Sequence, residues 1–274
     1  MNEKISLAGD LGSGKSTVSA ILKERLSAET YSTGALVRDI ARAHGMTVGE
    51  LNIYMETHPE IDREIDDGLC RLSDDARRLI IDSRMAWHFT KCTFRVYLST
   101  DLETSAVRIL NAGRAEEHTD SLAETMRETF ARRQSEKKRY MEQYGVDIKD
   151  FGNYDLVIDT TLATPADIAD AVCENFERWR GGDFRPTVLL CPGRILCPDD
   201  MPDELAVSEC VRDIREGNTP DVAVAEKDGN IYLIDGYAAV AAYYGEHRTF
   251  LPARIVRCDI PDGHFIRLDR RLSC

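Results

Sequence analysis

The chain has 274 residues and a formal net charge of −13, from 35 basic and 48 acidic side chains. This acidity argues against binding nucleic acid or an anionic membrane over a broad surface, because both require a basic face. No apolar run approaches the roughly 20 residues of a membrane-spanning helix, and the first residues lack the pattern of a secretory signal. The eight cysteines are scattered without a C-x-x-C pair, which favours reduced thiols. We therefore expect a soluble, cytoplasmic protein without a membrane partner.

Strand-like and helix-like segments alternate over the first two-thirds of the chain. Apolar runs predict strands at residues 4–8, 79–82, 93–98 and 155–159. Helical spacing and capping residues predict helices at residues 18–26, 34–44, 47–58, 59–76 and 120–144, and others that begin at Leu102 and Thr164. Such alternation implies right-handed crossovers and a parallel sheet with helices on both faces. The predicted fold class is α/β.

The alternation breaks at residues 179–186, a polar, glycine-containing stretch that ends in Pro186. We interpret this stretch as a boundary between a domain at 1–180 and a smaller α+β domain at 184–274. In the second domain, Asp228-Gly229 between two apolar runs predicts a hairpin. The other elements expected there are strands at 187–190 and 252–257 and helices at 203–216 and 237–244.

Residues 9–16, G-D-L-G-S-G-K-S, match the phosphate-binding pattern G-x-x-x-x-G-K-[ST] and stand between a predicted strand and a predicted helix. Glycines let backbone N–H groups turn toward phosphate oxygens, and the helix N-terminus adds partial positive charge. Lys15 is expected to reach the β- and γ-phosphates, and the Ser16 hydroxyl to bind Mg²⁺. The expected nucleotide-binding residues of this loop are Gly9, Gly12, Ser13, Gly14, Lys15, Ser16 and Thr17. The first domain is therefore predicted to have the P-loop NTPase type of α/β fold and to bind ATP with Mg²⁺.

Together with this loop, further segments of residues 3–178 resemble the cytidylate kinases, which are short P-loop nucleoside-monophosphate kinases. The segments are S-T-G-A-L-V-R at 32–38, I-I-D-S-R at 80–84, E-T-F-A-R-R-Q-S-E-K-K-R-Y at 128–140 and Y-D-L-V-I-D-T at 154–160. The resemblance implies phosphoryl transfer from ATP to a nucleoside monophosphate, with CMP and dCMP as the first candidates. The alternatives are a P-loop kinase for another small metabolite or RNA, and a non-catalytic nucleotide-sensing regulator.

The resemblance also implies which residues hold the acceptor. Guanidinium groups bind phosphate through paired hydrogen bonds, which fix its orientation as well as its charge. The positions that match the family's acceptor segments are Thr33, Gly34, Arg38 and Arg84. The plainer interpretation of both arginines is a solvated surface role.

The remaining roles that the resemblance implies belong to the transfer step and to the ATP site. Asp82 is expected to help bind Mg²⁺, and Arg108 to lie against the adenine ring. With Lys15 and Asp82, the expected catalytic residues are the lid residues Arg132, Lys137 and Arg139, which would bring positive charge to the transferring group. The plainer interpretations are a helix-capping aspartate and a solvated basic helix face.

Met85 stands where bacterial members of the family commonly have an aspartate that reads cytosine. A thioether cannot supply the acceptor that the cytosine amino group needs. The sequence therefore does not determine which base the acceptor carries.

The second domain resembles the ParB/sulfiredoxin-like fold in the segments at 214–224, 228–242 and 251–256. Asp235-Gly236 keeps that fold's turn but lacks the His–Arg pair that often follows, so it is either an anion site or a capped turn. From residue 184 onward, 11 basic and 15 acidic side chains argue against nucleic-acid binding. We expect an accessory domain for regulation, acceptor recognition or oligomerisation, with nucleotide substrates as the partners of the whole chain and a homo-oligomer as one open alternative.

Overall fold

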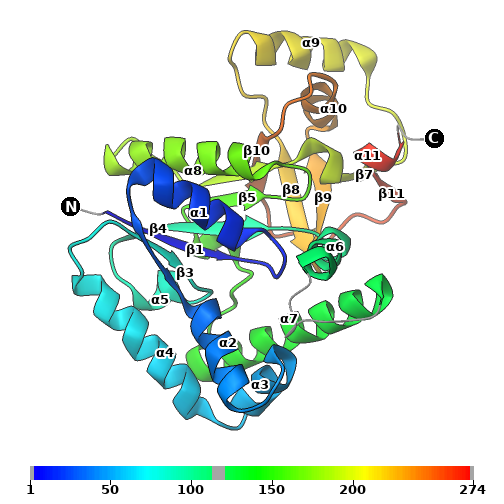
Figure 1. Cartoon of the computed structure of the whole chain (residues 1–274). Coiled ribbons are helices and arrows are strands. Elements are labelled where there is room, and N and C mark those ends of the chain that lie inside the picture. The colour runs from blue at the N-terminus through cyan, green and yellow to red at the C-terminus, as the bar shows by residue number, and fades with distance from the viewer. Residues whose placement is uncertain (1–2, 113–120, 272–274) are drawn as a thin grey trace.

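The computed structural model describes residues 3–112 and 121–271 (Figure 1). In this part of the chain the strands form one 11-stranded sheet. In their order across the sheet they are β11 (Phe265–Arg267), β7 (Leu196–Pro198), β9 (Asn230–Asp235), β8 (Ala223–Lys227), β10 (Leu251–Ile255), β6 (Thr187–Leu190), β5 (Leu156–Asp159), β4 (Thr93–Ser99), β1 (Lys4–Gly9), β3 (Leu79–Asp82) and β2 (Glu29–Ser32). The helices are α1 (Lys15–Leu26), α2 (Thr33–Ala43), α3 (Val48–Met55), α4 (Pro59–Arg71), α5 (Ala86–Phe89), α6 (Leu102–Ala112), α7 (Leu122–Tyr144), α8 (Pro165–Arg180), α9 (Glu204–Arg215), α10 (Tyr237–Gly245) and α11 (Leu268–Arg271).

The strands β2, β3, β1, β4, β5 and β6 all run parallel to one another. Successive residues of β3 point to opposite faces: Ile80 packs in the core under α1 and α8, whereas Ile81 packs in the core with α3 and α4. Helices therefore cover both faces, with α1 and α8 on one side and α2 to α5 and α7 on the other (Figure 1). This part of the chain has the predicted α/β fold with a mostly parallel sheet.

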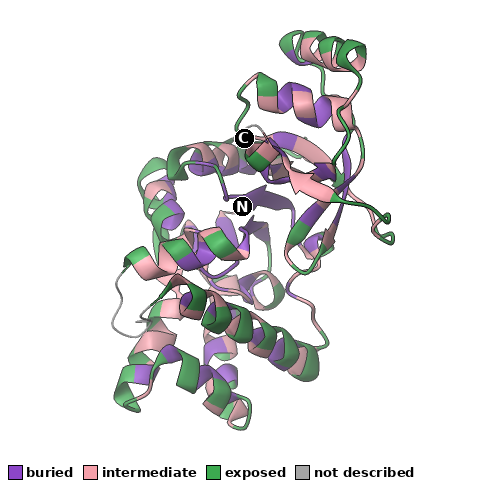
Figure 2. Ribbon diagram, turned by 90° about the vertical axis from the view of Figure 1, so that its right-hand side faces the viewer, coloured by how far each residue is buried: buried purple, intermediate pink, exposed green. Residues whose placement is uncertain are grey.

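The sheet and a hydrophobic core both continue past residues 179–186. Strand β6 lies parallel to β5, and β10 then pairs with β6 in the antiparallel sense. One core cluster joins Tyr97 and Val157 of the parallel strands to Val224, Leu233 and Val240 of the C-terminal segment. Buried residues follow the strands from one end of the molecule to the other in Figure 2. The C-terminal segment is thus attached by shared strands and shared apolar contacts.

Local signals in the sequence account for several of the element boundaries. The capping box before α3 is present: the Thr47 amide donates to Glu50 Oε2 at 2.7 Å, and the Glu50 amide donates to Thr47 Oγ1 at 3.1 Å. The Asp228-Gly229 hairpin joins β8 to β9, and both residues have positive φ, 53° and 83°.

The differences from the predicted elements concern short or polar segments. Helix α4 ends at Arg71, and a short 3₁₀ turn follows it, so the prediction of a helix to residue 76 was too long. Strand β2 has the sequence E-T-Y-S, with two exposed and two half-buried residues, so it carries no apolar pattern. The elements β7, β11, α5 and α11 have three or four residues each, too few for a periodicity.

Two simpler expectations concern the whole chain. In the described ranges, every helix is too short or too polar to cross a membrane. The described cysteines, Cys70, Cys92, Cys173, Cys191, Cys197, Cys210 and Cys258, are all free thiols.

Candidate functional site

Glycines determine the shape of the loop between β1 and α1. Gly12 and Gly14 have φ of 69° and 85°, in the left-handed region that favours glycine. A Cβ on Gly12 would lie 2.5 Å from the carbonyl oxygen of Ser105, so a larger residue would displace the loop. Among the described residues no side chain caps α1 at Gly14. The first N–H groups of α1 are therefore available to an anion.

Lys15 closes this loop through its ammonium group. Its Nζ donates to the carbonyl oxygens of Gly9 at 2.9 Å and Asp10 at 2.8 Å. Burial, with the nearby Arg84 cation, lowers the pKa of Lys15 to about 8. The hydroxyl of Ser13 is buried and has no hydrogen-bond partner among the described residues, so the loop contains a polar group that a ligand can satisfy.

A cavity of about 380 Å³ opens beside the loop and collects most of the predicted site residues. It lies between the loop, the start of α2, the end of β3 and the helices α6 and α7. The predicted residues that line it are Gly12, Ser13, Gly14, Lys15, Ser16, Thr17, Thr33, Gly34, Arg38, Asp82, Arg84, Arg108 and Arg132. We refer to it as the nucleotide cavity, and its lining is strongly cationic.

Two of these arginines share a buried carboxylate. Glu136 is 3% exposed and receives Arg84 Nε at 2.6 Å and Arg132 Nε at 3.2 Å. Burial alone would raise the pKa of Glu136, but the charges of Arg84 and Arg132 hold it below its ordinary value. The carboxylate keeps both guanidinium groups at the wall of the cavity. Sequence reasoning missed this role, since nothing local distinguishes Glu136 from the other acids of α7.

Arg38 and Arg108 contribute to the cavity in different ways. Arg38 is half-buried at the wall and has no ion-pair or hydrogen-bond partner among the described residues, so its charge is available to an anion. Arg108 donates to the Thr160 carbonyl at 2.7 Å and to the Gly12 carbonyl at 3.4 Å. It therefore joins the phosphate loop to the segment after β5.

The structure does not bring Lys137 and Arg139 to the nucleotide cavity. Lys137 pairs with Asp147 at 3.2 Å and lines a different, larger cavity. Arg139 is 4% exposed, and its Nε lies 3.2 Å from Asp62 Oδ2. Lys137 is five residues from Arg132 and therefore faces another side of α7. Arg139 is seven residues from Arg132 and lies on the same side two turns farther along the helix, where it contacts Asn52 of α3 and Asp62 of α4.

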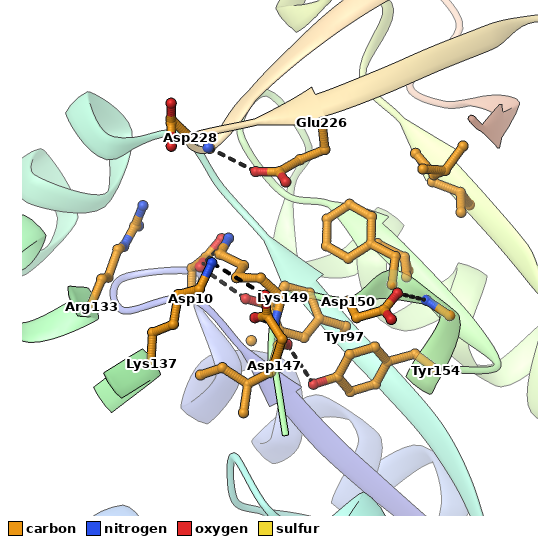
Figure 3. Close-up of a pocket in the computed structure, with 18 of the residues that line it drawn as sticks. Asp10, Tyr97, Arg133, Lys137, Asp147, Lys149, Asp150, Tyr154, Glu226 and Asp228 are labelled. Atoms are coloured by element: carbon orange, nitrogen blue, oxygen red, sulfur yellow. Dashed lines mark hydrogen bonds and ion pairs between the residues drawn. The ribbon is translucent and has the colours of Figure 1, made fainter. Parts of the chain in front are cut away.

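The larger cavity, of about 930 Å³, borders the start of the phosphate loop, and Asp10 is among the side chains around it (Figure 3). Gly9, Asp10 and Leu11 form part of its wall. The buried Asp10 carboxylate accepts Lys149 Nζ at 2.6 Å and the Tyr97 hydroxyl at 2.9 Å. These contacts hold the beginning of the loop, and the predicted residue Gly9 lies here.

One family model and three relatives are similar to this chain. A family model described as an AAA domain matches residues 5–139. The cytidylate kinase of Thermoplasma acidophilum is 33% identical over 191 residues, which are 68% of this chain and 99% of that protein. The cytidylate kinase of Thermoplasma volcanium is 34% identical over 191 residues, 68% of this chain and 98% of that protein. An S-adenosylmethionine-dependent nucleotide dehydratase of Lacinutrix mariniflava is 36% identical over 189 residues, which are 69% of this chain and 39% of that relative.

The parallel sheet, the glycine-shaped loop with its lysine and these matches define a P-loop kinase domain in the first two-thirds of the chain. The chain belongs to the cytidylate kinase family.

Proposed function

We propose that the protein transfers a phosphoryl group from ATP to a nucleoside monophosphate, with CMP and dCMP as the first candidates. The observation that carries the proposal is the convergence of Lys15, Arg38 and Arg84 on one cavity. The loop would hold one polyphosphate, and the two arginines would hold the phosphate of the acceptor. An acceptor phosphate is already an anion, so its oxygen attacks in line without a general base.

The donor set of the cavity fits Mg²⁺ as well as ATP. Ser16 and Asp82 line the same space, and hydroxyl and carboxylate oxygens are the ligands that Mg²⁺ prefers. The unpartnered Ser13 hydroxyl also points to a missing polar partner at the loop. Bound there, Mg²⁺ would neutralise charge on the phosphates, while Lys15, Arg84 and Arg132 orient them.

Met85 supports a second candidate, a P-loop kinase for another metabolite or for RNA. Its side chain is 3% exposed, packs in the core with α3 and α4, and does not line the nucleotide cavity. The position that reads cytosine in many relatives is therefore closed to the acceptor here. One relative is named a nucleotide dehydratase and not a cytidylate kinase, so the names of the relatives do not all point to CMP.

For residues 184–274 we propose an accessory role, as a ParB/sulfiredoxin-like unit fixed to the kinase unit at 1–180. The support is the continuous sheet through β6 and β10 and the shared core. A third candidate follows from this attachment: a nucleotide sensor without turnover, in which the accessory unit responds to the occupied loop.

An acceptor screen on the full chain separates these candidates. Coupled ADP release would be measured with ATP, Mg²⁺ and a panel of nucleoside monophosphates, and in parallel with a metabolite extract and labelled ATP. Turnover with CMP or dCMP supports the first proposal, and turnover with the extract alone supports the second. ATP binding without turnover, both with the monophosphates and with the extract, would support the third candidate, the nucleotide sensor.

We predict that Arg38→Met raises KM for the acceptor by about 30-fold, because a charge-assisted phosphate contact is worth about 2 kcal/mol. KM for ATP should change little, since Arg38 comes from α2 and Lys15 holds the other polyphosphate. Steady-state kinetics with each substrate varied in turn provide the measurement. The matched control is Arg42→Met on the same helix, where the guanidinium pairs with Asp39 on the surface. An equal effect of both substitutions would contradict the assignment.

ATP binding should depend on pH through Lys15. With a pKa of about 8 in the free protein, its ammonium is mostly charged below pH 8 and loses its proton above it. Phosphate favours the charged form, so the Kd for MgATP should be nearly constant below pH 8 and should rise by up to about tenfold per pH unit above it. Fluorescence titration with a nucleotide analogue measures this. Lys15→Met should bind weakly with no such rise, and the same rise in that variant would refute the cause.

A further inference from the structure

The larger cavity has the size of a small-molecule site and lies where the kinase unit meets the C-terminal segment. Its volume of about 930 Å³ is at the upper end of the roughly 300–1,000 Å³ typical of ligand pockets. Helix α7, the segment after it and the end of β4 form one side, and the β8–β9 hairpin with the end of β10 forms the other (Figure 3). Its wall includes apolar residues such as Phe151, Val188 and Ile255 as well as charged ones. We refer to it as the interface cavity.

Helix α7 presents separate sides to the two cavities. Phe130, Arg133, Gln134 and Lys137 have the spacing of one helix face, and all line the interface cavity. Arg132 lines the nucleotide cavity. The two spaces are neighbours, since Leu11 and Arg84 line both of them. A ligand of the interface cavity would thus lie beside the phosphate loop without occupying it.

Most charges around the interface cavity compensate each other in pairs. The ion pairs are Arg84–Glu136 at 2.6 Å, Lys137–Asp147 at 3.2 Å, Lys149–Asp10 at 2.6 Å and Arg257–Asp150 at 2.8 Å. These side chains already have counter-charges and contribute little attraction for a ligand ion.

Three charged groups of the lining remain without an ion-pair partner among the described residues: Arg133, Glu226 and Asp228. Within residues 3–112 and 121–271, Arg133 donates only to the Leu11 carbonyl, at 3.4 Å, and its buried Nε has no hydrogen-bond partner. Glu226 accepts the Gly229 amide at 2.7 Å, and Asp228 lies exposed in the turn. Figure 3 shows Arg133 rising from α7 and the two carboxylates on the hairpin above the cavity. No ion pair joins Arg133 to them, so opposite charges face one space from opposite sides.

We propose that the interface cavity binds a zwitterionic small molecule, with its anionic group at Arg133 and its ammonium group at Glu226 and Asp228. Each end of such a ligand meets an opposite charge that has no ion-pair partner among the described residues. A ligand with charge of only one sign would pair with the protein charge on one side of the cavity and leave the charge on the other side unpaired, which lowers its affinity. The apolar wall accommodates the carbon chain between the two ends. This site is additional to the nucleotide cavity and does not depend on the acceptor proposed above.

Isothermal titration calorimetry on the full chain tests the proposal with four probes. O-phosphoethanolamine and 4-aminobutyrate carry an ammonium with a phosphate or a carboxylate, so they distinguish the two kinds of anionic end. Ethanolamine and inorganic phosphate carry only one of the charges. At least one zwitterion should bind at millimolar concentration or below, and at least about tenfold more tightly than either single ion. Absence of binding by both zwitterions, or equal binding of inorganic phosphate, would overturn the proposal.

Variants locate the binding. Arg133→Gln and Asp228→Asn should each weaken it by about tenfold, because each removes one end's counter-charge. Arg133→Lys, which keeps the charge, should restore most of it, and this rescue separates a charge role from a folding defect. Lys138→Gln is the matched control, since Lys138 pairs with Glu56 away from both cavities. Lys15→Met should still bind the zwitterion. If Lys15→Met lost this binding and Arg133→Gln kept it, the ligand would lie in the nucleotide cavity and the proposed site would be refuted.

Discussion

Replacing Lys15 by Met is expected to lower kcat/KM for phosphoryl transfer by about 10³-fold. Lys15 is the one ammonium group among the residues that line the nucleotide cavity. Its ammonium group donates hydrogen bonds to two carbonyl oxygens of the loop. These contacts hold the side chain in place and leave the positive charge available to phosphate oxygens. Methionine keeps an unbranched side chain one atom shorter and removes the charge, so the loss falls on the transition state, where charge on the phosphoryl group is spread over the oxygens.

The matched control is Lys23→Met, an exposed lysine in the last turn of the same helix, which should leave kcat/KM within about twofold of the parent. Both variants should have unfolding midpoints close to that of the parent, because Lys15 makes no ion pair in the described structure. Kinetics with the acceptor identified by the screen provide the measurement. A Lys15→Met enzyme with nearly full activity would contradict the proposed role of the loop and the proposed phosphoryl transfer.

The sequence predicted the kinase unit well because its signals are local. A strand, a glycine-rich loop and a helix start occur within about 20 residues, and the chain geometry leaves few other ways to place Lys15. The parallel sheet followed from alternating apolar runs, such as those that became β3 and β4. What local patterns did not show is the pairing of distant strands. The junction of β5 with β6 and of β6 with β10 depends on partners far apart in the chain.

The site was predicted in part for the same reason. Arg38 and Arg84 line the nucleotide cavity with Lys15, which is the arrangement expected from the family resemblance. For α7, the sequence showed a concentration of cations but not which of them face the cavity. Arg139 is held by the buried Asp62, and Arg132 is held by Glu136, and both partners are ordinary acids in the sequence. Which acid pairs with which arginine depends on the side chains that become buried together, and this is known only from the assembled fold.

The interface cavity had no signal in the sequence. It arises because residues near Lys149 and Glu226, far apart in the chain, come to face one space. The buried Asp10 borders this cavity. In the sequence it is one of the variable positions of the loop motif, to which the motif assigns no role. Burial favours the neutral carboxyl, yet the charges of Lys149 and Arg133 hold the pKa of Asp10 below its ordinary value. Asp10 is therefore a charged carboxylate, paired with Lys149 beside the interface cavity.

A second large effect is expected from Asp159→Asn, which should destabilise the fold by about 3–5 kcal/mol. Asp159 at the end of β5 is 0% exposed and Arg194 is 3% exposed, and Arg194 Nη1 lies 2.7 Å from Asp159 Oδ1. Arg194 also donates to the Gly229 carbonyl at 2.8 Å, so the pair joins the kinase unit to the C-terminal segment. Burial opposes the charge of Arg194, but Asp159 raises the pKa of the guanidinium above its ordinary value. Asparagine keeps the shape of the side chain and leaves a buried cation without its counter-charge.

Urea unfolding followed by circular dichroism measures this loss, and the thermal midpoint should fall by roughly 10 °C. The matched control is Asp170→Asn, which breaks an exposed ion pair with Arg25 and should cost less than about 1 kcal/mol. The double variant Asp159→Asn/Arg194→Met should recover part of the stability, since it removes the uncompensated charge together with its partner. If the two units are held together mainly by the shared apolar core, Asp159→Asn would resemble Asp170→Asn, and the buried pair would have no role in joining them.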